Sequence, residues 1–308
     1  MTTGVLVMAY GTPGSPERVE EYYTHIRRGR PPTPEQLTDL TTRYDAIGGT
    51  SPMAERTRAQ VDALASALDA IEPDGFVTVL GQKHASPFIE DGVATLVGVG
   101  VDRIVGVVLA PHFSAGSVGQ YLDRARAAAV EAGVEVTAVE SWHLLDELIA
   151  FQAGAVRTAL STLTERTKVV FTAHSLPERL LTDDPYADQL RQSAEATARA
   201  AGLAHLAGWG LGWQSAGRTP ERWRGPDIVE IVRDLADTGR ADGILVVPQG
   251  FTSDHLEVLY DLDIDAAAVA AEVGLAFART PVLNDDPSVM AALARRVADA
   301  ARTAAGDS

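Results

Sequence analysis

Short apolar runs rich in β-branched residues recur along the chain, and most are followed by a polar turn and a stretch with helical periodicity. Strands that alternate with helices in this way are typical of a parallel sheet covered by helices on both faces. The sequence therefore predicts an α/β fold. The runs expected to form strands are residues 4–9, 76–80, 103–110, 134–139, 168–172, 211–215 and 243–247.

The order of these features repeats within the chain. The segment IVGVVLAPHFSAGSVGQY resembles ILVVPQGFTSDHLEVLY, since both have an apolar strand, a proline, Phe, Ser and a helix carrying a tyrosine. We therefore expect two similar doubly wound, Rossmann-like domains, at 1–143 and 144–286, with a cleft between them facing strand C-termini. Helix 287–305 could pack back on the first domain. The other predicted helices are residues 17–23, 34–44, 55–68, 89–97, 117–132, 145–163, 188–201 and 226–237.

Charge and cysteine content exclude several classes of function. The net charge of −16 argues against a nucleic-acid partner or an anionic membrane surface. The chain has no cysteine, which excludes disulfides, thiolate zinc sites and cysteine-ligated iron–sulfur clusters. The N-terminus has no basic segment and no apolar run approaches the length of a membrane span, so we expect a cytoplasmic protein without an anchor.

Three carboxylates follow the strand at 243–247 at steps of four residues: Glu257, Asp261 and Asp265. On a helix, residues four apart lie on one face, where like charges repel unless a cation or protons lie between them. A solvated acidic face is the alternative. Because this spacing drifts by roughly 40° per step on an α-helix, we predict a π-type segment between Leu256 and Asp265.

His174 lies at the tip of the preceding strand unit, in the segment Ala173-His-Ser-Leu-Pro177. An imidazole facing the carboxylate of Glu257 can bind a divalent transition metal weakly or accept protons. A histidine that only caps its turn is the alternative. Other polar groups at strand tips are Tyr10, Lys83, His84, His112 and Gln214. Structural or surface roles are expected for His25, His112, His143, His205 and the four tryptophans, Trp142, Trp209, Trp213 and Trp223.

Arginines are concentrated in one segment of an otherwise acidic protein. Arg27, Arg28, Arg30 and Arg43 precede a glycine-rich turn that ends at Ser51. Guanidinium groups bind carboxylates through two parallel hydrogen bonds. The segment is therefore either a solvated basic loop or a site for a small ligand with several negative charges.

Long motifs identify a family resemblance that spans nearly the whole chain in the same order. The chain resembles the ferrochelatases, and most closely the soluble coproporphyrin ferrochelatases of Gram-positive bacteria. The segments that carry the resemblance are MAYGTP, YYTHIRRGRPP, RYDAIGGTSPMA, KHASPFIED, LAPHFS, TAHSLPE, GWQSAGRTP and GFTSDHLEVLYDLD.

The resemblance implies insertion of ferrous iron into a porphyrin held between the two domains. It implies that His174 and Glu257 bind the iron and carry the catalysis, and that Tyr10 is an axial ligand on the opposite face of the macrocycle. Asp261 and Asp265 could form an outer site for a second divalent cation, or a path for metal or protons. The residues implied to bind the porphyrin are Tyr10, Arg27, Arg43, Tyr44, Ser51 and Tyr121.

The arginine-rich loop at 24–51 favours coproporphyrin III, a tetra-acid, over protoporphyrin IX, which has two carboxylates. The alternatives are a chelatase for another metal and tetrapyrrole, such as nickel, cobalt or zinc, and a non-catalytic tetrapyrrole or metal carrier. A monomer that transiently hands its product to other heme-pathway enzymes is expected. Asp265 stands where the family pattern has glutamate, and Arg218, Arg222 and Arg224 receive no role from the sequence.

Overall fold

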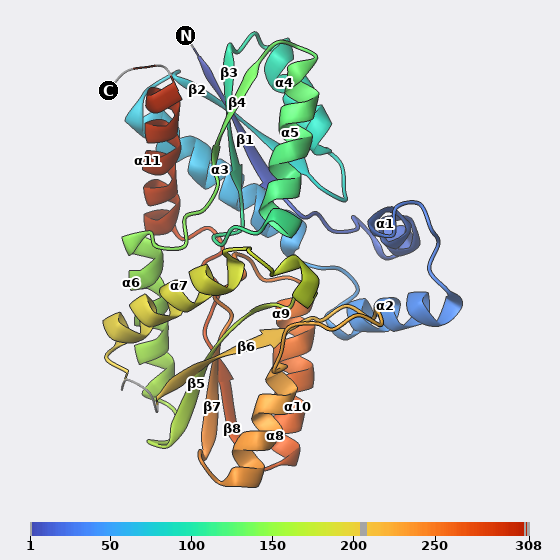
Figure 1. Cartoon of the computed structure of the whole chain (residues 1–308), viewed down its shortest axis with the longest axis vertical. Coiled ribbons are helices and arrows are strands. Elements are labelled where there is room, and N and C mark those ends of the chain that lie inside the picture. Colours follow the sequence, from blue (N-terminus) through green and yellow to red (C-terminus); the bar gives the residue numbers. More distant parts are fainter. Residues whose placement is uncertain (1, 204–207, 305, 307–308) are drawn as a thin grey trace. The chain divides into compact units, whose positions relative to one another are not determined.

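The structure is a computed structural model that describes residues 2–203, 208–304 and 306. By its internal contacts the chain divides into two compact units (Figure 1). Unit 1 comprises Met1–Ala110, Ala115–Trp142 and Asn284–Ser308, and unit 2 comprises Pro111–Ser114 and His143–Leu283. Each unit contains a four-stranded parallel sheet flanked by helices, so the predicted doubly wound α/β fold is confirmed. The assignment of functional domains with a boundary at residue 143 stays a prediction.

The sheet of unit 1 has the strand order β2-β1-β3-β4. The central strand β1 is fully buried from Val5 to Met8. Four consecutive buried apolar residues are expected where helices cover both faces of a parallel sheet. The strands are β1 (Thr3–Ala9), β2 (Phe76–Gln82), β3 (Arg103–Val108) and β4 (Glu135–Val139).

Four long helices cover this sheet, with α3 packed against α11 and α4 packed against α5 (Figure 1). Helices α1 and α2 form a separate pair, and α2 begins in a capping box in which Thr33 and Gln36 satisfy each other's backbone N–H groups. The helices are α1 (Val19–Ile26), α2 (Pro34–Ala46), α3 (Met53–Ile71), α4 (Ile89–Gly98), α5 (Gln120–Val130) and α11 (Pro287–Ala304), with short turns η1 (Pro16–Arg18) and η2 (Ala115–Gly119).

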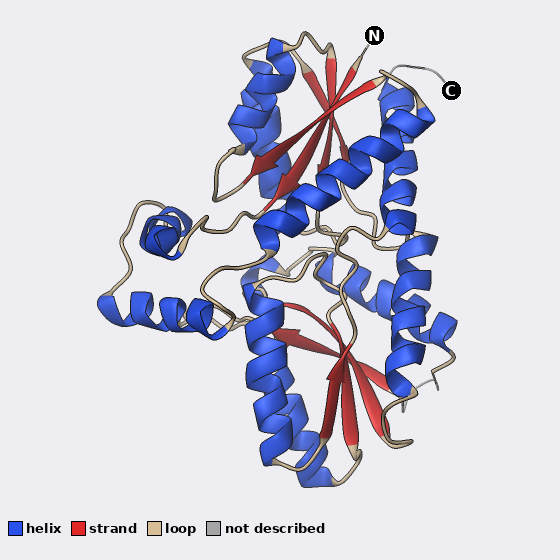
Figure 2. Cartoon of the chain, turned by 180° about the vertical axis from the view of Figure 1, so that it is seen from behind, coloured by secondary structure: helices blue, strands red, loops and turns tan. Residues whose placement is uncertain are grey.

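The sheet of unit 2 has the order β6-β5-β7-β8 (Figure 2) and separates two apolar clusters. Val169 and Phe171 of β5 pack in one cluster, whereas Val170 packs in the other. This alternation follows from the period of two along a strand. The strands are β5 (Thr167–His174), β6 (Trp209–Gln214), β7 (Gly243–Val247) and β8 (Ala276–Arg279).

Helices α6 and α7 pack together on the first cluster, and α8 packs against η4 and α10 on the second. Val258 of α9 and Leu262 and Ala266 of η4 lie in the second cluster, and their burial holds the acidic segment in place. The elements are α6 (Asp146–Leu160), η3 (Glu178–Leu180), α7 (Tyr186–Ala201), α8 (Ile228–Thr238), α9 (Leu256–Tyr260), η4 (Asp261–Ala266) and α10 (Ala267–Glu272).

Two predictions of local structure need correction, and one strand was not predicted. The helix expected at 117–132 instead begins with a π-helical turn, η2, and continues as α5 to Val130. The strand expected to end at Thr172 continues to His174, because its pairing with β6 extends that far. The edge strand β8 was not predicted, since four residues ending in an arginine carry too little apolar signal. Ala305 and His205 lie outside the described residues.

Candidate functional site

The ends of β5 and β6 bring two polar side chains together in unit 2. His174 is the last residue of β5 and pairs in register with Gln214, the last residue of β6. The Gln214 amide donates to the backbone carbonyl of Glu257 at 3.2 Å. Sites in open α/β sheets lie at these carboxyl ends of strands, so the position of His174 is the one expected for a functional residue.

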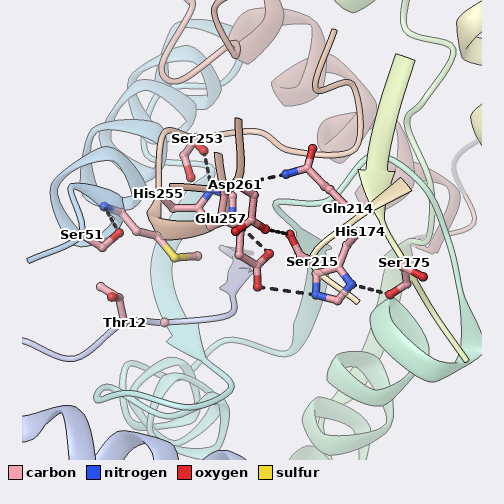
Figure 3. Close-up of polar contacts among 12 residues, drawn as sticks. Thr12, Ser51, His174, Ser175, Gln214, Ser215, Ser253, His255, Glu257 and Asp261 are labelled. Atoms are coloured by element: carbon pink, nitrogen blue, oxygen red, sulfur yellow. Dashed lines mark hydrogen bonds and ion pairs between the residues drawn. The ribbon is translucent and has the colours of Figure 1, made fainter. Parts of the chain in front are cut away.

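Glu257 lies between two imidazoles (Figure 3). Its Oε1 lies 3.5 Å from Nε2 of His174, and its Oε2 lies 3.5 Å from Nε2 of His255. The side chains of His174 and Glu257 are 35% and 36% exposed, so both remain accessible to a small ligand. His255 was missed by the sequence analysis. Its signal was its position in the Asp-His-Leu-Glu motif, where the extended backbone at the start of α9 directs its ring toward Glu257.

Both nitrogens of His174 face oxygen atoms. Nδ1 lies 2.5 Å from the carbonyl oxygen of Ser175, opposite the contact of Nε2 with Glu257. Burial opposes the charged imidazole, but the carboxylate of Glu257 outweighs it and raises the pKa of His174 to about 9. Burial likewise opposes the carboxylate, yet the two imidazoles hold the pKa of Glu257 well below its ordinary value. Without metal, the pair is an imidazolium and a carboxylate at neutral pH.

Asp261 and Asp265 continue the acidic face beyond Glu257. Asp261 accepts a hydrogen bond from Ser215 Oγ at 2.5 Å, and Asp265 is exposed. Ser215 has a φ of 60°, an uncommon backbone conformation for a residue with a side chain, and it was also missed by the sequence analysis. Asp263 accepts hydrogen bonds from Arg279 instead.

The predicted π-type segment is confirmed, although it begins only at Asp261. Glu257 lies in the α-helical turn α9, and the π-helical η4 runs from Asp261 to Ala266. Four residues overshoot one α-helical turn by roughly 40°. The wider π turn rotates less per residue, so it reverses part of this drift between Asp261 and Asp265. The mixed helix therefore aligns the three carboxylates better than a continuous α-helix would.

A loop of unit 2 braces the turn that follows His174. Arg224 N donates to the carbonyl of Leu176, and Glu178 N donates to the carbonyl of Arg222. Arg224 also lies 3.3 Å from the Glu178 carboxylate and over the ring of Trp213. Arg224 thus has a structural role that the sequence did not reveal. Arg218 and Arg222 are exposed.

Unit 1 holds Tyr10, the residue implied as an axial ligand. Its side chain follows β1 and is 39% exposed. The ring lies 4.6 Å from that of His84, and His84 Nδ1 lies 3.0 Å from Nδ1 of His25. Burial lowers the pKa of His84 to about 3, helped by the positive charge of Lys83, so this histidine is neutral.

Tyr121 lies beside a cation that the sequence analysis placed only as a strand-tip residue. The ammonium of Lys83 lies 4.9 Å from the centre of the Tyr121 ring and donates to Gln120 at 2.8 Å. Burial, followed by the charges of Arg124 and Arg28, lowers the pKa of Lys83 to about 8. Arg124 holds the carbonyl of Lys83 and the carboxylate of Glu90.

The remaining residues implied to bind porphyrin also lie in unit 1. Tyr44 is buried, with its hydroxyl 3.5 Å from Thr12 Oγ1, and Ser51 Oγ accepts from Met53 N. Arg43 pairs with Asp39 at 3.4 Å. Arg27 donates to the carbonyl of Arg30.

Two of the other histidines and two of the tryptophans are buried. His112 is buried and contacts Ser193 Oγ at 2.8 Å, and His143 contacts Gln192 at 3.0 Å, so both have the expected structural roles. Trp142 and Trp213 are buried packing residues, as predicted.

Metal binding here would rest on few ligands. Across residues 2–203, 208–304 and 306, no three His, Cys, Asp or Glu side chains are arranged to hold a metal ion. His174 and Glu257 supply one nitrogen and one carboxylate, a set that suits borderline divalent metals such as Fe²⁺. An incomplete set suits a metal that is delivered and released rather than retained. In the same described part of the chain, no helix is long and apolar enough to cross a membrane.

The family model and two relatives each match nearly the whole length of the chain. The sequence model of the family Ferrochelatase matches residues 2–301. A coproporphyrin III ferrochelatase of Anoxybacillus flavithermus is 43% identical over 298 residues, which cover 94% of each chain. That of Bacillus subtilis is also 43% identical, covering 94% of this chain and 95% of the relative.

Two solved structures share the fold. SirB from Bacillus subtilis with Fe³⁺ superposes with a TM-score of 0.59 at 14% identity, covering 99% of this chain and 98% of that one. CbiX, described as the terminal enzyme of siroheme biosynthesis in denitrifying bacteria, gives 0.54 at 16% identity, covering 96% and 98%. At these identities the likeness shows the fold alone.

Proposed function

The chain belongs to the ferrochelatase family, and from this premise we propose that it is a lyase that inserts Fe²⁺ into coproporphyrin III, giving coproheme in heme biosynthesis. The observation that carries the site assignment is the 3.5 Å contact of His174 with Glu257 at the carboxyl end of β5. Fe²⁺ is the substrate of this reaction, and the two side chains are its temporary ligands.

We propose that Fe²⁺ and a proton bind alternately to Nε2 of His174. When Fe²⁺ binds Nε2, the imidazolium must lose its proton, and the carboxylate of Glu257 supplies the second ligand. When Fe²⁺ leaves for the porphyrin, the free imidazole can take up one of the two pyrrolic protons that the ring must lose. The raised pKa of His174 favours that uptake.

The geometry of the porphyrin also matters for this step. A planar macrocycle hides its nitrogens from an approaching metal, so a site that favours a bent ring stabilises the shape of the transition state. Tyr10 of unit 1 stays the predicted axial ligand. Asp261 and Asp265 form the outer part of the acidic face, where a second divalent cation could bind. A monomeric state and a transient handover of product stay predictions.

The preference for coproporphyrin III rests on arginines of unit 1. Within the described residues, no ion pair with a carboxylate forms at Arg27, Arg28 or Arg30, in a chain whose net charge is −16. Lys83 adds a partly buried ammonium beside Tyr121. These cations match a porphyrin with four carboxylates better than one with two.

Anaerobic steady-state assays with Fe²⁺ and either porphyrin test this proposal. We expect kcat/KM to be higher for coproporphyrin III, and the R27Q variant to lose more of it with coproporphyrin III than with protoporphyrin IX. R166Q is a suitable control, because Arg166 forms an exposed ion pair with Asp242 in unit 2. A higher kcat/KM for protoporphyrin IX would contradict the proposed substrate.

A further inference from the structure

The guanidinium of Arg279, at the end of the edge strand β8, is bound on three of its nitrogens. Nε and Nη2 donate to the two carboxylate oxygens of Asp263 at 2.6 and 2.9 Å. Nη2 also donates to Asp254 at 3.1 Å, and Nη1 donates to the carbonyl of Thr280. The side chain is only 16% exposed, so these are not loose surface contacts.

Along the chain, one of the two carboxylates comes before the helix that carries Glu257 and the other comes after it. Asp254 directly precedes His255, the N-cap of α9, and Asp263 lies in η4, which follows α9. Helix α9 has five residues and continues directly into η4. A single guanidinium therefore fixes the chain before and after the turn on which Glu257 sits.

Arg279 also divides the acids of this segment into two sets. Asp254 and Asp263 bind the guanidinium, whereas Glu257 contacts two imidazoles and Asp261 accepts from Ser215. Asp263 lies two residues beyond Asp261, so the two side chains do not share a helix face. An arginine remains charged at all relevant pH values, so a divalent cation competes poorly for carboxylates that it already holds.

We propose that Arg279 is a positioning residue for metal insertion: it holds the Glu257 carboxylate toward His174 and keeps Asp254 and Asp263 from binding the metal. The inference rests on the proposed role of Glu257 as a metal ligand. It assigns a function to β8, which lies at the edge of the sheet and not at the strand tip that carries His174.

The test compares R279Q and R279K with a control variant, R191Q. Arg191 also bonds two carboxylates, of Asp188 and Glu195, but on the exposed face of α7. For each folded variant, the KM for Zn²⁺ is measured at saturating coproporphyrin III, and the KM for coproporphyrin III at saturating Zn²⁺. Mn²⁺ binding stoichiometry is measured without porphyrin.

We expect R279Q to raise the KM for Zn²⁺ by about tenfold or more, as a misplaced ligand should, and to leave the KM for coproporphyrin III within about twofold. Because Asp263 loses its guanidinium partner, R279Q should also bind more Mn²⁺ than the wild type. R279K keeps the positive charge but loses the planar guanidinium that binds a carboxylate through two hydrogen bonds. Its KM for Zn²⁺ should therefore lie between those of the wild type and R279Q. R191Q should match the wild type in each measurement. A merely structural role would lower the active fraction without raising the KM for metal alone.

A folded R279Q protein with an unchanged KM for Zn²⁺ would overturn the inference. If R279Q does not fold, the D263N variant is tested instead, and it should raise the KM for Zn²⁺. The double variant R279K/D263N should have a KM for Zn²⁺ no higher than that of R279K. An additive effect of those two changes would also overturn it. E257Q, run alongside, separates the two proposals. If E257Q leaves the KM for Zn²⁺ unchanged, the role of Glu257 fails; if only R279Q leaves it unchanged, the role of Arg279 fails.

Discussion

At the scale of single residues, Glu257 owes its proposed role to the groups on either side of it. Two imidazole nitrogens lie 3.5 Å from its two oxygens. This arrangement keeps the carboxylate ionised, and a metal that binds to it replaces a proton on His174 rather than on Glu257. Because both side chains are about one-third exposed, water screens the attraction between them.

Metal affinity should therefore increase with pH. The pKa of His174 is raised to about 9, so its proton-linked stabilisation of the fold is fully present below its ordinary pKa of 6.5 and is lost as pH rises through 9. Below pH 9 a metal must displace that proton. Calorimetry with Zn²⁺ between pH 6.5 and 8 should show release of about one proton and an affinity gain of up to about tenfold per pH unit.

The H174N variant is the control for this measurement, since its amide carries no titrating proton. It should bind Zn²⁺ weakly and without that pH dependence. An affinity of the wild-type protein that stays constant from pH 6.5 to 8 would show that His174 is not the group displaced.

At the scale of secondary-structure elements, the mixed α and π helix after β7 connects the core to the acidic face. Val258, Leu262 and Ala266 are fully buried on its inner side, while Glu257, Asp261 and Asp265 follow each other on another side. Both sets recur every four residues, so an uninterrupted α-helix would rotate Leu262 and Ala266 away from the core and the outer carboxylates away from Glu257 by the same angle. Packing and site geometry therefore favour the π segment together.

Leu262 tests this connection, because it is fully buried within η4. Replacing it with alanine should destabilise unit 2 by about 2–5 kcal/mol, the usual cost of a large cavity in a core. The measurement is urea unfolding at constant protein concentration. L259A is the comparison, since Leu259 is only partly buried and should cost less. Equal losses in the two variants would show that η4 is not held by its core contacts.

At the scale of the whole molecule, the sequence predicted the architecture because each central strand is a continuous apolar run, as in β1 and β7. It also predicted the π segment, because three acidic residues at steps of four would not line up on one face of an ordinary α-helix. His255, Ser215 and Arg279 could not be found in this way. Their roles depend on an extended N-cap, a strained turn and a contact across 16 residues of sequence, and none of these leaves a periodic pattern.

The central claim is that metal insertion depends on the His174–Glu257 pair. Its most direct test follows the absorbance of coproporphyrin III during anaerobic incubation with Fe²⁺, for the wild-type protein, H174A and the control H143A. We expect the spectrum of the metallated porphyrin with the wild type and with H143A, and a rate lower by at least about 100-fold with H174A. A folded H174A protein that inserts Fe²⁺ at the wild-type rate would contradict the account.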